Sequence, residues 1–339
     1  MPPALRFVRN CLYTLFLALL SVLAGLIGTW ILVHQPAAIE APEQVVQVKR
    51  GAGLRQIAAQ LHEAGVISHP LPFVLFAKVQ GMAPRLQAGE YVLSANMSPA
   101  EILDALYLGK VRHHVFTVPE GATLRDIAVL VESVHLGSSE SVMELGSDPA
   151  FIASLGLSVP TLEGYLFPDT YFLTRDMEVA DLLAVMVETL DRSYPPEIAI
   201  KAEALEFSKH DVITLASLIE KEAQVDAERE LISAVFHNRL RRGMRLQCDS
   251  TVIYALGANF DGNLTKADLK TDSPYNTYRY GGLPPGPIAS PGGRSIAAAV
   301  SPADVTYLYF VATRQDGAHH FSKTLKEHNR AVRRYQLNR

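Results

Sequence analysis

Three charged residues interrupt an apolar, helix-like run at 215–224, LASLIEKEAQ. They are Glu220, Lys221 and Glu222, and charges inside such a run usually have a partner or a chemical task. At about 100° per residue, Glu220 shares a helix face with small and apolar side chains, whereas Glu222 projects to nearly the opposite side. The two carboxyl groups therefore cannot work together as one acid–base pair.

Glu220 is the acid that this geometry favours for chemistry. A carboxyl group surrounded by small apolar side chains is easily kept protonated, which suits a general acid that works near neutral pH. Lys221 and Glu222 are better explained as residues that hold the helix in place. The helix alone also allows a structural ion pair at Glu220, and it does not decide between the two interpretations.

Motifs for other kinds of catalysis are absent from the sequence. It has no Ser-x-x-Lys, Gly-x-Ser-x-Gly or His-Glu-x-x-His motif, and no phosphate-binding glycine loop before a helix. The adjacent His319 and His320 are a poor metal signal by themselves, so we expect neither a metal ion nor a cofactor. With 35 acidic and 31 basic residues, the chain has no positive excess to attract nucleic acid. Of the kinds of catalysis considered, only acid–base chemistry by carboxyl groups is left.

Residues 11–33 contain no charge and are long enough to cross a membrane. As a helix they would span about 34 Å, compared with roughly 30 Å for the hydrocarbon core of a bilayer. Arg6 and Arg9 precede this segment, which predicts a cytoplasmic tail at 1–10 and an exported remainder. A cleaved signal peptide is the alternative, although its apolar region is normally shorter.

An internal repeat follows a short Pro/Ala linker at 34–44. The segments 48–61 and 118–131 share Val, Gly-Ala, Leu-Arg and Ile-Ala at equal positions, and each is typical of a strand, a glycine turn and an amphipathic helix. The first copy continues into a second strand at 86–94 and a helix that begins after Ser98. A strand-helix-helix-strand unit of this size resembles a LysM module, a fold that binds glycans. A module used only for packing is the alternative.

The second half of the chain carries strong helix signals. Ser208 and Asp211 form a capping-box pattern before the helix that contains Glu220, and Asp226 is expected to cap the next helix. The segment 305–312 has the pattern of a buried strand. We therefore expect an α+β fold with one N-terminal transmembrane helix (11–33), a LysM-like α+β module (45–113), a second repeat with a connecting segment (114–160), and a mixed α/β domain that holds the catalytic residue (161–339).

Several long motifs together identify a family. In chain order they are LEGYLFPDTY (162–171), ASLIEKEA (216–223), FHNRL (236–240), MRLQCDSTVIYALG (244–257), YNTYRYGGLPPGPIASPG (275–292) and YLYFVA (307–312). With these motifs in this order over nearly the whole chain, the sequence resembles the YceG-like family of MltG-type endolytic murein transglycosylases. The succession of a membrane helix, a LysM-like module and a catalytic domain is similar as well.

The resemblance implies an enzyme, a lyase that acts on peptidoglycan. Members of the family cleave the β-1,4 bond between N-acetylmuramic acid and N-acetylglucosamine without water, which leaves a 1,6-anhydro end and limits the length of nascent glycan strands. The family's catalytic glutamate is the first acid of the Glu-Lys-Glu triplet, which is Glu220 in this sequence. One carboxyl group suffices, because it can protonate the glycosidic oxygen and then accept the proton of the muramic C6 hydroxyl.

Six further residues are expected near this glutamate. Those that could hydrogen-bond a sugar or stack on its ring are Gln247, Tyr275, Asn276 and Tyr278. Two acids that could bind substrate, orient the catalytic residue or cap a turn are Glu163 and Asp249. For each of the six, a purely structural role is the alternative.

The resemblance also implies where the protein acts and with what. Its substrate would be the glycan strands of peptidoglycan, and its protein partners would be the peptidoglycan synthases (penicillin-binding proteins) of the same membrane. It would be a single-pass protein of the bacterial inner (cytoplasmic) membrane, held in the lipid by residues 11–33, with its C-terminal domain in the periplasm. Two other functions stay open: a muramidase that uses water, and a non-catalytic wall-binding scaffold for division.

Overall fold

The structure, a computed structural model, describes residues 3–175, 177–313 and 317–337, and only the backbone of residues 3–9 and 11. The chain forms two compact units. The N-terminal unit comprises Met1–His114 and Phe172–Met177, and the C-terminal unit comprises Val115–Tyr171 and Glu178–Arg339. Most of the second repeat therefore belongs to the same unit as the helix that carries Glu220.

The described part of the chain is α+β, mostly helical with three two-stranded sheets. The expected class is confirmed, but the C-terminal unit is a helical body with small sheets and not the mixed α/β domain predicted for 161–339. The physical reason is that its long buried apolar segments pack as helices around one central helix, while its strands are only four residues long.

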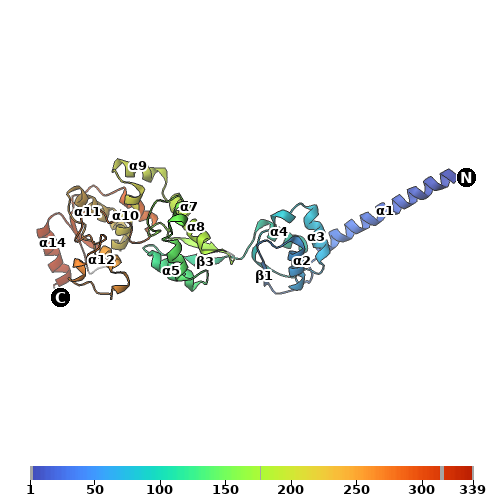
Figure 1. Cartoon of the computed structure of the whole chain (residues 1–339), viewed down its shortest axis with the longest axis horizontal. Coiled ribbons are helices and arrows are strands. Elements are labelled where there is room, and N and C mark those ends of the chain that lie inside the picture. Colours follow the sequence, from blue (N-terminus) through green and yellow to red (C-terminus); the bar gives the residue numbers. More distant parts are fainter. Residues whose placement is uncertain (1–2, 176, 314–316, 338–339) are drawn as a thin grey trace. The chain divides into compact units, whose positions relative to one another are not determined.

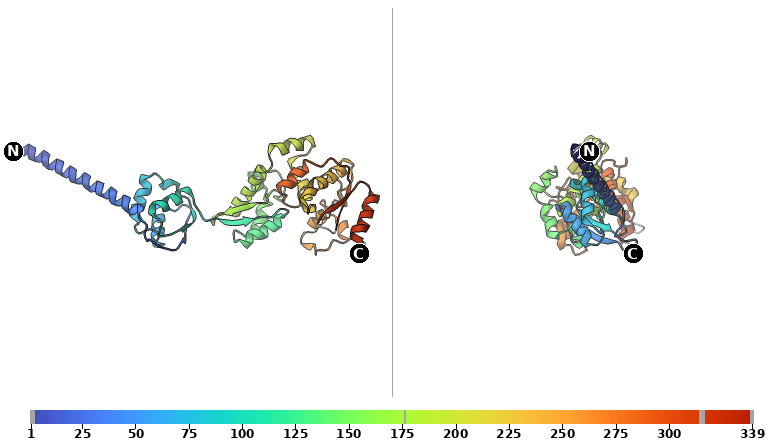
Figure 2. Two further views of the ribbon diagram at one scale, coloured as in Figure 1. Left: turned by 180° about the vertical axis from the view of Figure 1, so that it is seen from behind. Right: turned by 90° about the vertical axis from the view of Figure 1, so that its right-hand side faces the viewer.

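The N-terminal unit begins with one continuous helix, α1 (Pro3–His34), which is visible in Figures 1 and 2. Within α1, Leu12–His34 is long and apolar enough to cross a membrane. The elements that follow are β1 (Gln44–Val48), α2 (Leu54–Glu63), α3 (Pro70–Val79), a 3-10 turn (Ala83–Arg85), β2 (Gly89–Leu93) and α4 (Pro99–Leu108). This strand-helix-helix-strand order is the one expected from the sequence.

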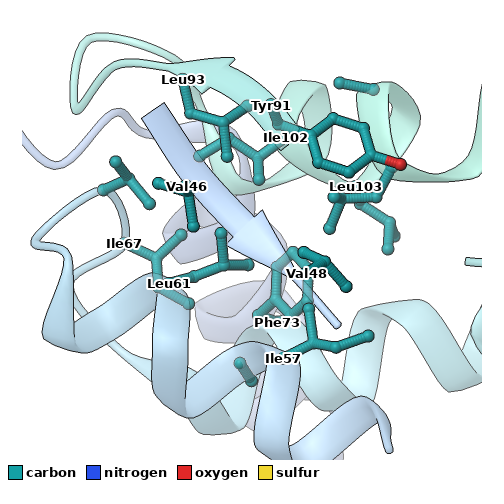
Figure 3. Close-up of a cluster of buried hydrophobic side chains, with 14 of the residues drawn as sticks. Val46, Val48, Ile57, Leu61, Ile67, Phe73, Tyr91, Leu93, Ile102 and Leu103 are labelled. Atoms are coloured by element: carbon teal, nitrogen blue, oxygen red, sulfur yellow. The ribbon is translucent and has the colours of Figure 1, made fainter. Parts of the chain in front are cut away.

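The core of the N-terminal unit lies between its sheet and its helices. β1 and β2 pair antiparallel with Val46 opposite Tyr91, and side chains from α2, α3 and α4 close the core. Figure 3 shows Leu61, Phe73 and Ile102 gathered about these strands. Each is fully buried, and burial of one such apolar side chain contributes about 1.5–3 kcal/mol.

The C-terminal unit is built around α10 (Lys209–Glu222), which packs against α11 (Arg229–Arg241), α12 (Asp249–Leu256) and α13 (Gly293–Ala299) (Figure 1). Two short strands, β3 (His114–Thr117) and β4 (Thr170–Leu173), pair with each other, and the boundary between the units falls inside them. The remaining elements are α5 (Leu124–Ser133), α6 (Ser139–Leu145), α7 (Pro149–Ser154), α8 (Val179–Arg192), α9 (Pro196–Ala204), β5 (Tyr309–Ala312), β6 (His319–Ser322), α14 (Leu325–Val332), three 3-10 turns (Asp226–Glu228, Gly257–Asn259, Asp268–Lys270) and a π-helical turn (Arg333–Leu337).

Helix caps follow the sequence signals closely. Ser98 and Glu101 form a capping box at the start of α4, and Gly109 ends that helix with a φ of +64°. Ser208 and Asp211 form the expected capping box at the start of α10. Caps of this kind typically contribute about 1 kcal/mol each, so the position of α10 in the sequence is determined locally.

Of two other local predictions, one is confirmed in part and one is wrong. The strand expected over 305–312 is only β5, because two carbonyls upstream of it accept hydrogen bonds from the Asn238 side chain and not from a neighbouring strand. Asp226 opens a short 3-10 turn and does not cap α11. Its carboxylate contacts the Arg229 guanidinium at 3.3 Å.

Gly164 allows the segment 162–171 to pass close to residues 287–289. It has a φ of +77°, and a Cβ at this position would lie 2.2 Å from Cβ of Pro287 and 3.2 Å from the carbonyl oxygen of Ala289. Gly156 in the same unit has nearly the same φ, +76°, but no atom lies within 4 Å of the corresponding Cβ position. Substitutions at Gly156 and Gly164 can therefore distinguish the cost of the left-handed backbone from the cost of a steric clash.

We expect Gly156→Ala to lower the free energy of unfolding by about 1–2 kcal/mol, the cost of a left-handed conformation alone. Gly164→Ala should cost about 1–3 kcal/mol more, because the methyl group also overpacks the contact with Pro287. Urea unfolding of the full chain in detergent, followed by circular dichroism, measures both losses. Equal losses would show that Gly164 is needed only for its backbone conformation.

Candidate active site

The helix α10 holds Glu220 at the end of a buried run. Residues 212–219 are all buried, so the helix cannot rotate or slide without exposing its apolar side chains. Glu220 itself follows this run, and its side chain is only 6% exposed. The helix therefore presents one acid from inside the protein and not from a mobile surface.

One face of α10 binds the proline loop, which we define as residues 283–292. Nε2 of His210 donates to the carbonyl oxygen of Pro285 at 2.8 Å, and Oγ of Ser217 accepts from the amide of Ile288 at 3.1 Å. From His210 to Ser217 the helix rises about 10.5 Å, which is nearly the distance that three extended residues cover from Pro285 to Ile288. Both hydrogen bonds can therefore form at once. The loop then reaches Glu220, one helical turn beyond Ser217, with its last residue, Gly292.

Two groups hold the carboxylate of Glu220. Oε2 accepts from the amide of Gly292 at 3.0 Å, and Oε1 accepts from Nη1 of Arg229 at 3.0 Å. Arg229 is also buried, and it donates to Oγ of Ser295 as well as to Asp226. Each carboxylate oxygen of Glu220 is therefore held by a hydrogen-bond donor, and Arg229 is held in turn by Ser295 and Asp226.

This arrangement corrects the expected apolar setting of Glu220. The small side chains on its helix face admit an extended backbone and a guanidinium, and not a dry apolar pocket. The turn at 223–228 is short enough for Arg229, the first residue of α11, to reach back to α10. The structural ion pair that the helix alone allowed is present in the described structure.

Sequence reasoning missed a second acid beside Glu220. Oε2 of Glu120 lies 3.9 Å from Nη2 of Arg229 and 3.8 Å from Nη2 of Arg294, and its side chain is 39% exposed. One guanidinium thus lies between the carboxylates of Glu120 and Glu220. The second repeat was the signal that could have predicted this acid, because Glu120 lies in its glycine turn, VPEGA. Backbone hydrogen bonds from this turn to Ser290 bring Glu120 close to Arg229.

Glu222 has different partners from Glu220, as the helical geometry predicts. Its Oε1 accepts from Sγ of Cys248 and from Oγ of Ser250, both at 2.9 Å. Burial, reinforced by the Glu222 carboxylate, raises the pKa of the Cys248 thiol, so the thiol stays protonated and donates. Lys221 donates to the carbonyl oxygen of Gly121 at 3.2 Å, which ties α10 to the second repeat.

A cavity of about 450 Å³ brings three of the predicted binding residues together: Gln247, Asp249 and Tyr278. Glu222 also lines this cavity, whereas Glu220 does not. The Tyr278 hydroxyl donates to Asp249, and burial together with this bond raises the pKa of Tyr278, so the hydroxyl remains a donor. The lining of the cavity thus combines polar and aromatic side chains.

Of the other predicted binding residues, Asn276 and Glu163 are buried and Tyr275 is half-buried. Asn276 is fully buried, and its amide donates to the carbonyl oxygens of Leu269 and Thr271. The ring of Tyr275 packs against the ring of Tyr254, with centroids 4.9 Å apart. In the structure these residues brace the loop before the proline loop.

Glu163 links three elements from a buried position. Its Oε1 accepts from the amide of Leu124 at the start of α5 at 3.0 Å, and its Oε2 accepts from the Tyr254 hydroxyl at 3.3 Å. Burial raises the pKa of Glu163 from 4.5 to about 7, although both hydrogen bonds oppose that shift. The carboxyl group is therefore close to half protonated at neutral pH.

Among the described residues, no group of three or more His, Cys, Asp and Glu side chains is arranged to hold a metal ion. His319 is engaged by Glu228, whose Oε2 lies 2.8 Å from its Nδ1.

Comparison with known proteins gives consistent matches. The model of the YceG-like family matches residues 46–334. The endolytic murein transglycosylase of Bacillus subtilis (strain 168) is 38% identical over 306 residues, which cover 86% of this chain and 84% of the relative. That of Streptococcus pneumoniae serotype 2 (strain D39) is 31% identical over 94% of this chain and 64% of the relative. A YceG-like protein of Listeria monocytogenes has a solved structure that matches with a TM-score of 0.60 at 35% identity, over 86% of this chain and all of that one.

The raised pKa of Glu163 predicts a pH-dependent stability. Between pH 4.5 and 7 the folded protein keeps a proton that the unfolded chain has lost, so the free energy of unfolding falls as pH rises through this window. The contribution of this one group is on the order of 3 kcal/mol. Glu163→Gln keeps an acceptor for Leu124 and should remove this component.

Urea unfolding of the full chain at pH 5 and pH 8 measures the effect. The loss of stability between the two values should be smaller in Glu163→Gln than in the wild type. Glu188→Gln, the same change on the exposed side of α8, should behave as the wild type does. If all three proteins lose stability equally, Glu163 does not titrate in this range.

Proposed function

The chain belongs to the YceG-like family, and from this membership we propose that it is a membrane-anchored endolytic murein transglycosylase, a lyase that cuts peptidoglycan glycan strands. The single observation that carries the proposal is the environment of Glu220. A buried carboxyl group, held on both oxygens at the end of a rigid helix, is fixed well enough to transfer protons at one point. We propose Glu220 as the catalytic residue.

The reaction needs this carboxyl group twice. Glu220 first gives its proton to the oxygen of the bond between N-acetylmuramic acid and N-acetylglucosamine, which lets that bond break at C1. The resulting carboxylate then accepts the proton of the muramic C6 hydroxyl as O6 attacks C1, giving the 1,6-anhydro end. No water enters, and the glutamate finishes protonated as it began. Arg229 and the Gly292 amide are placed to hold the carboxylate between the two steps.

Contacts to sugars away from the bond that is cut are proposed at the cavity lined by Gln247, Asp249 and Tyr278, because Glu220 does not line this cavity. The oxygens of the Asp249 carboxylate and of the Tyr278 hydroxyl offer acceptors to sugar hydroxyls, because the hydroxyl hydrogen of Tyr278 is already donated to Asp249. For Glu163, Tyr275 and Asn276 the contacts favour an indirect role, because they position the loops around α10 from within.

The apolar helix Leu12–His34 supports anchoring in the inner (cytoplasmic) membrane, with the chain that follows this helix in the periplasm. An anchored enzyme reaches only the wall next to the membrane, which suits a cutter of newly made strands. Peptidoglycan synthases of the same membrane are the protein partners that this placement favours.

Glu220→Gln tests the central assignment. The amide keeps the shape of the side chain but cannot give or take the proton, so cleavage of purified peptidoglycan should fall by at least about 10²-fold. Glu188→Gln, an exposed glutamate on α8, is the matched control and should cleave normally. Products are identified by mass spectrometry as 1,6-anhydro ends.

Two results would overturn this assignment. Full activity in Glu220→Gln would remove the residue from the chemistry, and loss of activity in Glu222→Gln alone would move the chemistry to the other acid. A wild type that binds peptidoglycan without cutting it would favour the scaffold function.

A hydrolytic muramidase is the second candidate, and Glu120 is the observation that favours it. Retaining glycosidases use two carboxyl groups about 5 Å apart, and Glu120 lies across one guanidinium from Glu220. The products separate the two functions, because hydrolysis leaves reducing ends that are heavier by one water. Reducing ends that disappear in Glu120→Gln would establish the muramidase.

Arg229 should matter for positioning. Arg229→Met removes the hydrogen bond to Oε1 of Glu220, and because small misplacements of a catalytic group are costly, we expect the cleavage rate to fall by about 10–10²-fold. Arg294→Met is the matched control, since Arg294 contacts Asp226 and Glu120 but not Glu220 in the described structure. A rate in Arg229→Met equal to that of the control would contradict the positioning role.

A further inference from the structure

An apolar groove of about 540 Å³ lies between α1 and α3 within the N-terminal unit. From α1 it is lined by Leu26, Ile27, Thr29 and Trp30, and from α3 by Leu75, Phe76, Val79 and Gln80. The groove is thus shared by the membrane-crossing candidate helix and a helix of the folded module.

The outward side of α3 is apolar as well. Leu71, Leu75 and Val79 are spaced by four residues, so they form one stripe along the helix, and they are 67%, 45% and 81% exposed. Lys78 is the one charged residue in α3. A stripe of this kind in water would leave large apolar side chains without cover.

The end of α1 is fixed to α3, so the two helices share a depth. Val33 is fully buried in the unit, and the ring of His34 meets the ring of Phe76 edge to face with centroids 5.8 Å apart. The groove residue Leu26 lies eight positions before His34, about 12 Å from it along the helix axis. Trp30 lies four positions before His34, about 6 Å from it along the same axis.

These lengths place the groove at the membrane. The 23 residues of Leu12–His34 span about 34 Å, only slightly more than the roughly 30 Å of the hydrocarbon core. If this segment crosses the bilayer, Leu26 must lie in the hydrocarbon of the outer leaflet and Trp30 near its boundary, where tryptophan is enriched. The facing residues of α3, Leu75 and Val79, must then lie at about the same depth.

We propose that α3 lies in the outer-leaflet interface of the membrane and that phospholipid acyl chains fill the groove between α1 and α3. Acyl chains are the expected occupant because the groove and the apolar stripe of α3 are continuous with the surface that α1 presents to lipid. The Lys78 side chain has a long apolar stem that lets its ammonium group reach the headgroups. The module is therefore seated on the bilayer and not suspended above it on a flexible tether.

This proposal rests on the membrane anchoring in the proposed function, and fluorescent labels can test the two separately. The variants Leu75→Cys and Val79→Cys are made singly in a full chain that carries Cys11→Ser and keeps Cys248 buried. The introduced thiol is labelled with the environment-sensitive fluorophore nitrobenzoxadiazole. The protein is reconstituted into phosphatidylcholine and phosphatidylglycerol vesicles that contain lipid brominated on the acyl chain. Matched controls place the label at Leu20 on α1 and at the exposed Gln56 on α2.

We expect brominated lipid to quench the labels at Leu75 and Val79 several-fold more than the label at Gln56. The label at Leu20 should be quenched at least as strongly as the labels at Leu75 and Val79. Quenching at Leu20 together with water-like behaviour at Leu75 and Val79 would overturn the proposal while leaving the anchor intact. Absence of quenching at Leu20 would mean that α1 is not in the bilayer, which would overturn both.

Discussion

The C-terminal unit depends on the contact between one face of α10 and the proline loop. His210, Ser217 and Glu220 lie on this face and bind the loop at Pro285, Ile288 and Gly292. Proline lacks an amide hydrogen, so the amides that remain free to donate in the loop are few, and two of them donate to α10. On its other side the loop exchanges two backbone hydrogen bonds with the second repeat through Ser290. The loop is thereby held between the helix and the repeat.

The same contact explains why segments far apart in the sequence meet at Glu220. The loop delivers the Gly292 amide, the second repeat delivers Glu120, and the start of α11 delivers Arg229. A Cβ at Gly292 would lie 1.9 Å from Oε1 of Glu120, so any larger residue at this position would displace the Glu120 side chain. The close approach of backbone to carboxylate is possible only with glycine at this position or with Glu120 displaced.

Local signals were sufficient to predict several of the elements but not their contacts. The caps of α4 and α10, the repeat and the place of Glu220 depend on residues within a few positions of one another, so pattern and spacing reveal them. The partners of Glu220 come from 9 and 72 positions away, and no periodicity encodes such distances. Asn276 illustrates the same limit, because an amide in a tyrosine-rich loop has the chemistry of a sugar ligand whether it faces outward or, as here, braces its own backbone.

The fixed position of Arg229 bears on the choice between the one-acid and two-acid mechanisms. A carboxylate that acts as a nucleophile must move toward C1, whereas one that only exchanges protons can stay where it is. Glu220 is bound on both oxygens, and its guanidinium partner is bound in turn to Asp226 and Ser295, so its movement would break several hydrogen bonds at once. Glu120 is the more exposed and the more loosely held of the two acids. A nucleophile, if the reaction used one, would be Glu120, and the rigid Glu220 suits a reaction in which the substrate supplies its own attacking oxygen.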